Sequence, residues 1–183
     1  VLVLSSRSGA LARSRAVESE WKPAPAADVV AFLQRSDTAD DVHTQCLVSN
    51  GFRPVAGVWH AAGVLSDCVL PKQTPIALSS IYKPKACGAL TLHRACAPTP
   101  LDTCVLFSSV AALLGSAGQA NYSAANCCLD ALACRRTVSA QAAASLQFGP
   151  WGEVGMAVDN NGLEAKLDAG GVRLLSLQLS FCS

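Results

Sequence analysis

The sequence has 183 residues, of which 51% are hydrophobic and 15% charged, and its formal net charge is +1. This length fits one domain, and the apolar fraction excludes a disordered chain. The small net charge argues against a broad nucleic-acid surface, and no apolar run approaches the ~20 residues that span a bilayer. We therefore expect one α/β domain that binds neither nucleic acid nor a membrane.

The cysteines indicate a reducing compartment. There are nine, an odd number, and none belongs to a C-x-x-C pair. Most lie between apolar residues, so we interpret them as small buried hydrophobes and expect neither a disulfide framework nor a metal site. No secretory signal is visible, which predicts a cytoplasmic protein. Organellar targeting of a longer parent chain stays open.

Strands and helices alternate along the chain. Apolar runs without alternation predict strands buried on both faces, as in parallel sheets. The first half contains predicted strands at 1–4, 28–33 and 55–59 and predicted helices at 10–22 and 40–49. The second half contains a helix from Thr74, a strand at 104–107, a glycine-punctuated loop, a helix at 119–134 and a strand at 143–148.

The helix that starts at Thr74 carries two prolines. Pro75 is tolerated in the first turn, whereas Pro84 should kink the helix. The side chains expected to line its buried face are Ile76, Ile81, Ala86, Leu90 and Ala97.

The most informative stretch is 101–130. Ser108 and Ser109 end a strand, and the next helix carries Tyr122 and Asn126, four residues apart and therefore on one face. Ligands of open α/β sheets bind outside the carboxyl ends of the strands. A hydroxyl at a strand end that faces a phenol suits proton transfer.

The spacing of Ser109, Tyr122 and Asn126 resembles the active site of the short-chain dehydrogenase/reductase superfamily. Most members carry lysine where this chain has Asn126. That exchange resembles the ketoreductase domains of modular polyketide synthases and animal-type fatty acid synthases, in which the lysine comes from an earlier helix. Lys85 lies in a matching context, KPKACGA. Further matching blocks are LVLSSRSG at 2–9, HAAGVLSD at 60–67, FSS at 107–109, GQANYSAAN at 118–126 and WGEVGMA at 151–157.

The resemblance implies a Rossmann-like, doubly wound parallel sheet, with 1–183 as a partial ketoreductase domain and 150–175 as a substrate lid. We expect the family's first strand, with its glycine-rich phosphate loop, and its last strand to lie outside this sequence. That first strand would lie between the strands at 1–4 and 55–59, at the centre of the sheet. The sheet of this chain should therefore be incomplete.

NADPH is the implied cofactor. Arg7 would hold its 2′-phosphate, although the residue alone also fits a solvated loop arginine. Asp37 would contact the adenine or, equally well, cap a turn. His60 is more plausible as a structural residue than as a base. The implied cofactor-binding set is Ser6, Arg7, Asp37, His60, Ala61, Ala62, Gly63 and Ser108.

The implied reaction reduces a β-ketoacyl chain on the phosphopantetheine arm of an acyl carrier protein. Tyr122 would be the general acid, and Lys85 would lower the pKa of its phenol. Ser109 would hydrogen-bond the carbonyl oxygen, and Asn126 would orient Lys85 or a relay water. Other domains of the same synthase are expected partners.

Substrate and stereochemical control would involve Asp67, Leu114, Gln119, Trp151 and Met156. VLSD at 64–67 resembles the leucine-aspartate-aspartate signature of one stereochemical class, with Ser66 replacing the first aspartate. Leu114 occupies the position of a tryptophan in the opposite class. Both features lean towards a D-configured alcohol. Loop capping by Asp67, and packing by Trp151 and Met156, are the alternatives.

Three other functions stay open at this point. The chain could be an inert structural piece of a synthase, since the expected phosphate loop is missing. It could be the ketoreductase of a fatty acid synthase. A free-standing dehydrogenase acting on a small alcohol is disfavoured, because Asn126 replaces the usual lysine.

Overall fold

The strands that the structure describes pair in parallel. The computed structural model describes residues 2–8, 31–49, 54–150, 171 and 174–176. Strand β1 (Leu2–Ser6) pairs with β2 (Ala31–Arg35). A second sheet has the order β3 (Gly57–His60), β4 (Thr103–Ser109), β5 (Ala144–Phe148). The parallel pairing confirms the α/β class and the Rossmann-like arrangement.

The two sheets differ from one continuous doubly wound sheet. Within the described residues, no ladder joins β1 to β3. This break lies where the resemblance places one further strand, so the sheet formed by the described residues is interrupted at the predicted position. The predicted helix at 10–22 lies outside the described residues.

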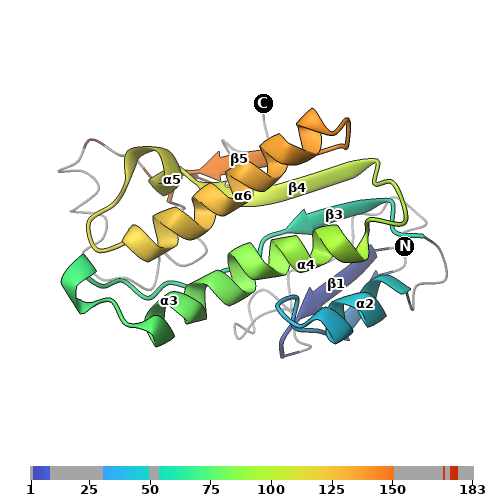
Figure 1. Ribbon diagram of the computed structural model, residues 1–183, viewed down its shortest axis with the longest axis horizontal. Coiled ribbons are helices and arrows are strands. Elements are labelled where there is room, and N and C mark those ends of the chain that lie inside the picture. The colour runs from blue at the N-terminus through green and yellow to red at the C-terminus, as the bar shows by residue number, and fades with distance from the viewer. Residues whose placement is uncertain (1, 9–30, 50–53, 151–170, 172–173, 177–183) are drawn as a thin grey trace.

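Helices α4 (Gly88–Ala95) and α6 (Ala120–Val138) lie on the same face of the β3–β4–β5 sheet (Figure 1). Ala89 of α4, Leu106 of β4 and Leu129 of α6 are buried together in the main core cluster. Three helical elements precede α4 in the sequence, namely α2 (Asp41–Ser49), η1 (Leu70–Lys72) and α3 (Pro75–Tyr82). A four-residue helix, α5 (Ala111–Leu114), occupies part of the predicted loop.

The helix from Thr74 to Ala95 contains a π-helical turn, η2 (Lys83–Cys87). Its start is as predicted, because the Thr74 hydroxyl accepts a hydrogen bond from Ala77 N at 3.1 Å and Pro75 fills the first helical position. Pro84 has no N–H to donate, and the wider π turn accommodates it. Pro84 and Lys85 are both buried by this turn.

Burial on both faces of the strands was a wrong prediction for the described residues. Strand β4 alternates between buried and half-buried side chains, and Val3 and Trp59 of β1 and β3 are exposed. The described helices α4 and α6 cover one face of their sheet, which leaves alternate side chains uncovered. Ile76, also predicted to be buried, is 83% exposed.

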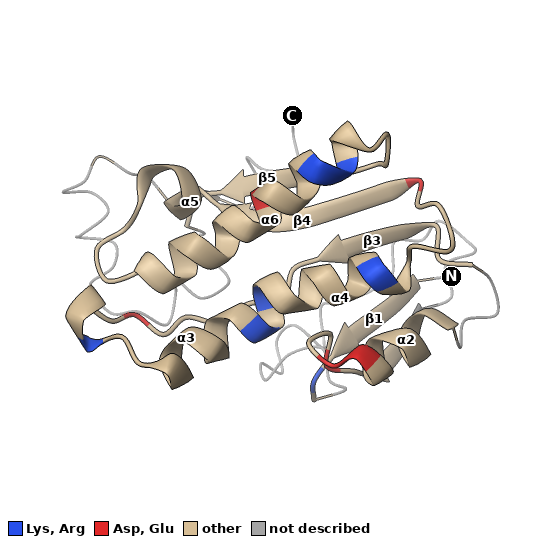
Figure 2. Cartoon of the chain, viewed as in Figure 1, with Lys and Arg blue, Asp and Glu red and all other residues tan. Residues whose placement is uncertain are grey.

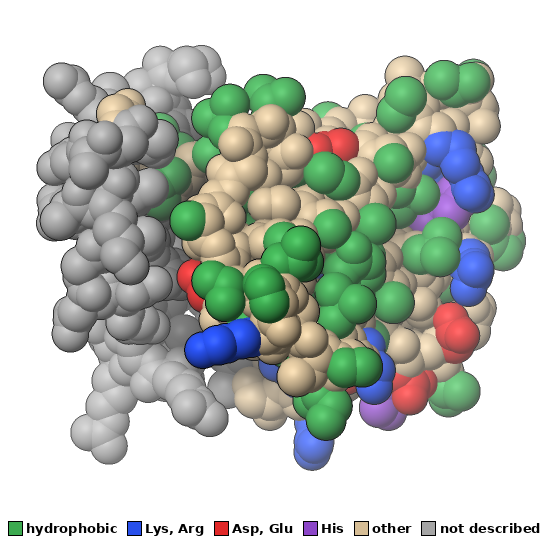
Figure 3. All heavy atoms as spheres, turned by 60° about the vertical axis from the view of Figure 1, so that its left-hand side comes forward, with side chains coloured by type: hydrophobic (Ala, Val, Ile, Leu, Met, Phe, Trp, Pro, Cys, Tyr) green, Lys and Arg blue, Asp and Glu red, His purple; other side chains and the backbone are tan. Residues whose placement is uncertain are grey.

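The cysteine prediction was also largely wrong. Of the eight described cysteines, only Cys96 and Cys104 are buried. The exposed ones are Cys46, Cys87, Cys127, Cys128 and Cys134. All five belong to η2 or to the helices α2 and α6, on faces turned away from the core. Figure 3 shows a group of apolar side chains near the middle of the face that it presents.

Charged side chains are sparse on the described chain, and some of them lie at helix ends (Figure 2). Asp41 lies in the first turn of α2, whereas Arg135 and Arg136 lie in the last turn of α6. Each charge complements the helix dipole at its end. Among the described helices, none combines the length and the apolar character that crossing a bilayer requires.

Candidate active site

The carboxyl end of β4 carries the two predicted serines. Ser108 is buried, and its hydroxyl lies 3.4 Å from the carbonyl oxygen of Asn126, to which it donates. The Ser109 hydroxyl accepts a hydrogen bond from Ala111 N at 3.2 Å, where the chain turns into α5. Because this bond uses an oxygen lone pair, the hydroxyl proton of Ser109 stays free to donate.

Lys85 points into the molecule from the π turn. Only 3% of its surface is exposed, and Nζ donates to the carbonyl oxygen of Phe107 at 2.9 Å. Nζ also lies 5.3 Å from the centroid of the Tyr122 ring, within cation–π range. Burial lowers the pKa of Lys85 to about 8, while the charge of Asp130 opposes this shift. At pH 7 the side chain is therefore mostly a cation beside the phenol.

Tyr122 and Asn126 lie on the buried face of α6, as their spacing predicts. Asn126 is fully buried, and its Nδ2 donates to the Tyr122 carbonyl oxygen at 2.9 Å. Its Oδ1 is buried and has no hydrogen-bond partner among the described residues. Buried carbonyl oxygens normally accept a hydrogen bond, so this atom is suited to hold a water molecule or a ligand group.

His60 supports the lysine rather than lining an open cofactor surface. It is 3% exposed, and Nε2 donates to the Lys85 carbonyl oxygen at 2.9 Å. Burial lowers its pKa, which favours the neutral ring. Gly63 also packs against this lysine, since an added Cβ would stand 3.3 Å from Lys85 Cε. His60 and Gly63 thus hold Lys85 in place, a role that the sequence did not reveal.

The other predicted cofactor residues lie at strand ends. Ser6 is the last residue of β1, and Arg7, which follows it, is exposed. Asp37 Oδ1 accepts from Ala39 N at 3.0 Å, which fits the turn-capping alternative. Ala61 is exposed and Ala62 half-buried after β3.

The predicted stereocontrol residues are described only in part. Asp67 Oδ2 accepts a hydrogen bond from Gln119 Nε2 at 3.0 Å, which brings these two residues together. Leu114 is 71% exposed on α5. Trp151 and Met156 lie outside the described residues, as does most of the predicted lid at 150–175.

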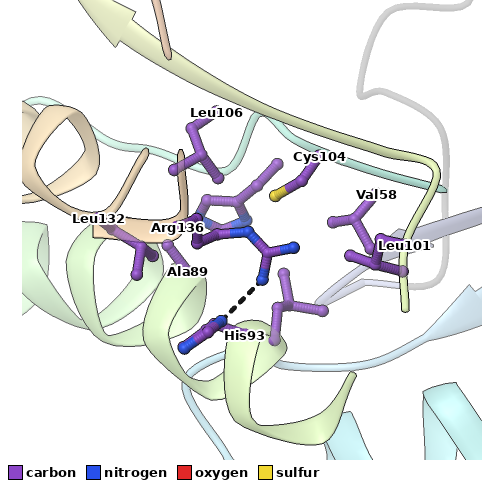
Figure 4. A pocket seen from close by; sticks show the side chains of 10 residues that line it. Val58, Ala89, His93, Leu101, Cys104, Leu106, Leu132 and Arg136 are labelled. Atoms are coloured by element: carbon purple, nitrogen blue, oxygen red, sulfur yellow. Dashed lines mark hydrogen bonds between the residues drawn. The ribbon is translucent and has the colours of Figure 1, made fainter. Parts of the chain in front are cut away.

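Two buried polar clusters were not predicted. One surrounds Asn121, whose amide bonds to Ser66 and Gln73 at the start of α6. The other lies at the far end of α6, where Arg136 Nη1 donates to His93 Nδ1 at 2.7 Å beside a cavity of about 10 Å³ (Figure 4). Both depend on contacts between residues some fifty positions apart, for which the sequence carries no local signal.

The KR domain family model matches residues 1–153. Mellein synthase of Phaeosphaeria nodorum is 34% identical over 93% of this chain, and 6-methylsalicylic acid synthase of Penicillium terrestre is 47% identical over 65%. The chain spans only 10% and 7% of those proteins. A solved structure of A-type ketoreductases from a modular polyketide synthase superposes with a TM-score of 0.83 and 36% identity, covering 96% of this chain and 37% of that one.

Proposed function

The chain belongs to the KR domain family, the ketoreductases of polyketide synthases, and we propose that it takes part in NADPH-dependent reduction of a β-ketoacyl thioester to a β-hydroxyacyl thioester. An acyl carrier protein would carry the acyl chain. The polypeptide would work beside other domains of the same synthase. The carrier and the neighbouring domains are proposed because the relatives that the chain matches include polyketide synthases, and the chain spans only 10% and 7% of the first two relatives.

Several residues near the strand ends are suited to bind parts of NADPH. Arg7 is an exposed guanidinium at the end of β1, suited to bidentate contact with a 2′-phosphate. The small residues Ala61, Ala62 and Gly63 allow a ligand to approach the Lys85 side chain closely, and the unpartnered Oδ1 of Asn126 is a further buried acceptor. When bound, NADPH supplies the hydride, which no side chain can donate.

The residues of the chain would supply a proton to the ketone oxygen and stabilise the negative charge that develops on it. A ketone accepts hydride poorly until its oxygen is protonated or polarised, and Tyr122 would donate that proton. Lys85 would place a cation beside the phenolate that forms as the proton leaves Tyr122, and Ser109 would donate a hydrogen bond to the same carbonyl oxygen. Asn126 would hold a relay water through Oδ1.

One observation carries the proposal: the ammonium of Lys85 is buried 5.3 Å from the Tyr122 ring centroid although burial of a charge is costly. A lysine on a helix surface normally extends into water. Here the π turn and His60 hold it inward, which supports a functional charge at this position.

The proposal is tested by supplying the full-length protein with NADPH and either a carrier-bound β-ketoacyl thioester or simple ketones and alcohols. We expect NADPH oxidation with the thioester and much slower turnover with the small compounds. Isothermal titration with NADPH tests the cofactor separately. Absence of both binding heat and turnover would overturn the proposal in favour of an inert structural piece.

A further inference from the structure

Asn121 is a buried amide with every polar group engaged. It is 2% exposed and immediately precedes Tyr122 at the second position of α6. The residue before the helix, Gln119, makes no side-chain cap, although the first N–H groups of a helix need partners. Asn121 Oδ1 supplies one of them by accepting from Tyr122 N at 2.8 Å. The amide therefore fixes the backbone of the tyrosine.

The other end of the same amide reaches the loop after β3. Asn121 Nδ2 donates to the Ser66 carbonyl oxygen at 2.9 Å and to Gln73 Oε1 at 3.1 Å. Gln73 Nε2 in turn donates to the Cys68 carbonyl oxygen at 2.8 Å. The two side-chain amides thus tie both ends of the 66–73 loop to the start of α6.

Two further bonds join the same loop to the residues just before α6. Cys68 N donates to the Gly118 carbonyl oxygen at 2.7 Å, and Gln119 Nε2 bonds to Asp67. Of these contacts, only those of Asn121 are made by a side chain that also holds Tyr122. Asn121 is therefore the link between the loop and the phenol.

We propose that Asn121 is a positioning residue that fixes the 66–73 loop relative to Tyr122 and so determines how the ketone lies against the proton donor. This inference rests on the proposed function. Reaction rates are sensitive to displacements of about 1 Å, and a loop free to move would let the ketone present either face. Both the rate and the configuration of the product then depend on this amide.

The decisive variant is Asn121→Asp in the full-length protein. It keeps the size and the acceptor for Tyr122 N but replaces both donors by a carboxylate facing Ser66 O and Gln73 Oε1. We expect kcat to fall by roughly 10–100-fold, with a mixture of product configurations and less than about twofold change in NADPH affinity. Gln45→Ala, which removes an exposed amide on α2, is the matched control and should change none of these.

A second variant, Gln73→Ala, guards against misfolding, since it leaves the Tyr122 cap intact and weakens only the loop. It should erode product configuration with a smaller loss of kcat. Wild-type configuration in both variants, with any rate loss matching the loss of folded protein, would overturn the proposal.

Hydrogen exchange separates this inference from the proposed function. Asn121→Asp should accelerate exchange of the Cys68 amide, whether or not the wild-type protein reduces a ketone. Unchanged exchange at Cys68 would overturn the link between the loop and α6. A wild-type protein without turnover, combined with faster exchange at Cys68, would instead reject only the proposed reaction.

Discussion

Among the described residues, two cations are buried near the two ends of helix α6, and they differ in whether burial can change their charge. Lys85 lies under the first turns and Arg136 in the last turn, with 3% and 4% of their surfaces exposed. Each donates to a backbone carbonyl oxygen, Phe107 O or Ala142 O. Arginine stays protonated in proteins, whereas lysine titrates readily when buried. Burial therefore lowers the pKa of Lys85 to about 8, whereas Arg136 keeps its charge.

The residues that surround Lys85 also differ from those that surround Arg136. Lys85 faces the Tyr122 ring and the glycine-lined end of β3, close to the strand ends where ligands bind in α/β sheets. Arg136 faces His93 in a small cavity beside Leu106 and Leu132. One end of α6 is arranged for chemistry, and the other for attachment of the helix to α4 and the sheet.

The largest expected effect is at the first end, from Tyr122→Phe. Removing the hydroxyl takes away the proposed proton donor while keeping the ring beside Lys85. We expect turnover to fall by roughly 10²–10⁴-fold in the full-length protein, the usual contribution of a general acid, with NADPH binding retained. Steady-state kinetics and titration with NADPH measure the two quantities. Turnover near the wild-type value would remove Tyr122 from the mechanism.

Lys85→Met should lower turnover and raise stability together. The pKa of Lys85 falls from 10.5 to about 8 on folding, so burying the charge costs on the order of 3 kcal/mol at pH 7. Loss of the bond to Phe107 O offsets about 1 kcal/mol of the gain, which leaves a net stabilisation of about 2 kcal/mol. Urea unfolding at pH 7 measures it.

The pH dependence supplies the control for this variant. Because the folded-state pKa is lowered, the wild-type protein loses its buried charge above pH 8 and gains stability up to about pH 10.5. The difference from Lys85→Met should shrink over that range. A variant less stable than wild type at pH 7 would contradict the assignment of a costly buried charge.

The sequence was sufficient to predict that Lys85 turns inward, because KPKACGA matches a family pattern, but not the means. The π turn depends on how Pro84 packs in the folded protein, and the bond from His60 crosses 25 positions of the chain. The parallel strands followed from their apolar runs. Which alternate side chains stay exposed, such as Trp59, depends on the helices that cover each face. Asn121 belongs to the matching block GQANYSAAN, but nothing in the sequence indicated its hydrogen-bond partners, Ser66 and Gln73.

At the C-terminal end of α6, Arg136→Met should lower the stability of the fold and leave turnover unchanged. The variant leaves Ala142 O and His93 Nδ1 without their donor, which costs about 1–3 kcal/mol for buried groups. Turnover per folded molecule should stay at the wild-type value, since position 136 lies about 21 Å along the helix from Tyr122. Arg135→Met, at the exposed neighbour, is the matched control, with an expected change below about 0.5 kcal/mol. Equal effects of the two would show that burial of Arg136 contributes nothing.

The smallest expected effect is on the loss of folding stability at acidic pH, and it involves His93. Burial, and then the charges of Arg136, Arg135 and Arg94, lower its pKa below the ordinary 6.5. The unfolded chain therefore binds a proton first as the pH falls, so the stabilising contribution is complete above pH 6.5 and is lost below it.

His93→Gln isolates this contribution, because glutamine can still accept from Arg136 but does not titrate. The buried His60, whose pKa burial also lowers, remains in both proteins, so its acid-induced loss cancels in the difference. We expect urea unfolding to give similar stabilities at pH 8 and a smaller acid-induced loss for the variant at pH 5.5. Identical losses in the two proteins would mean that His93 becomes protonated as easily in the fold as outside it. Arg136 would then not need a neutral acceptor, and the contrast between the two ends of α6 would rest on Lys85 alone.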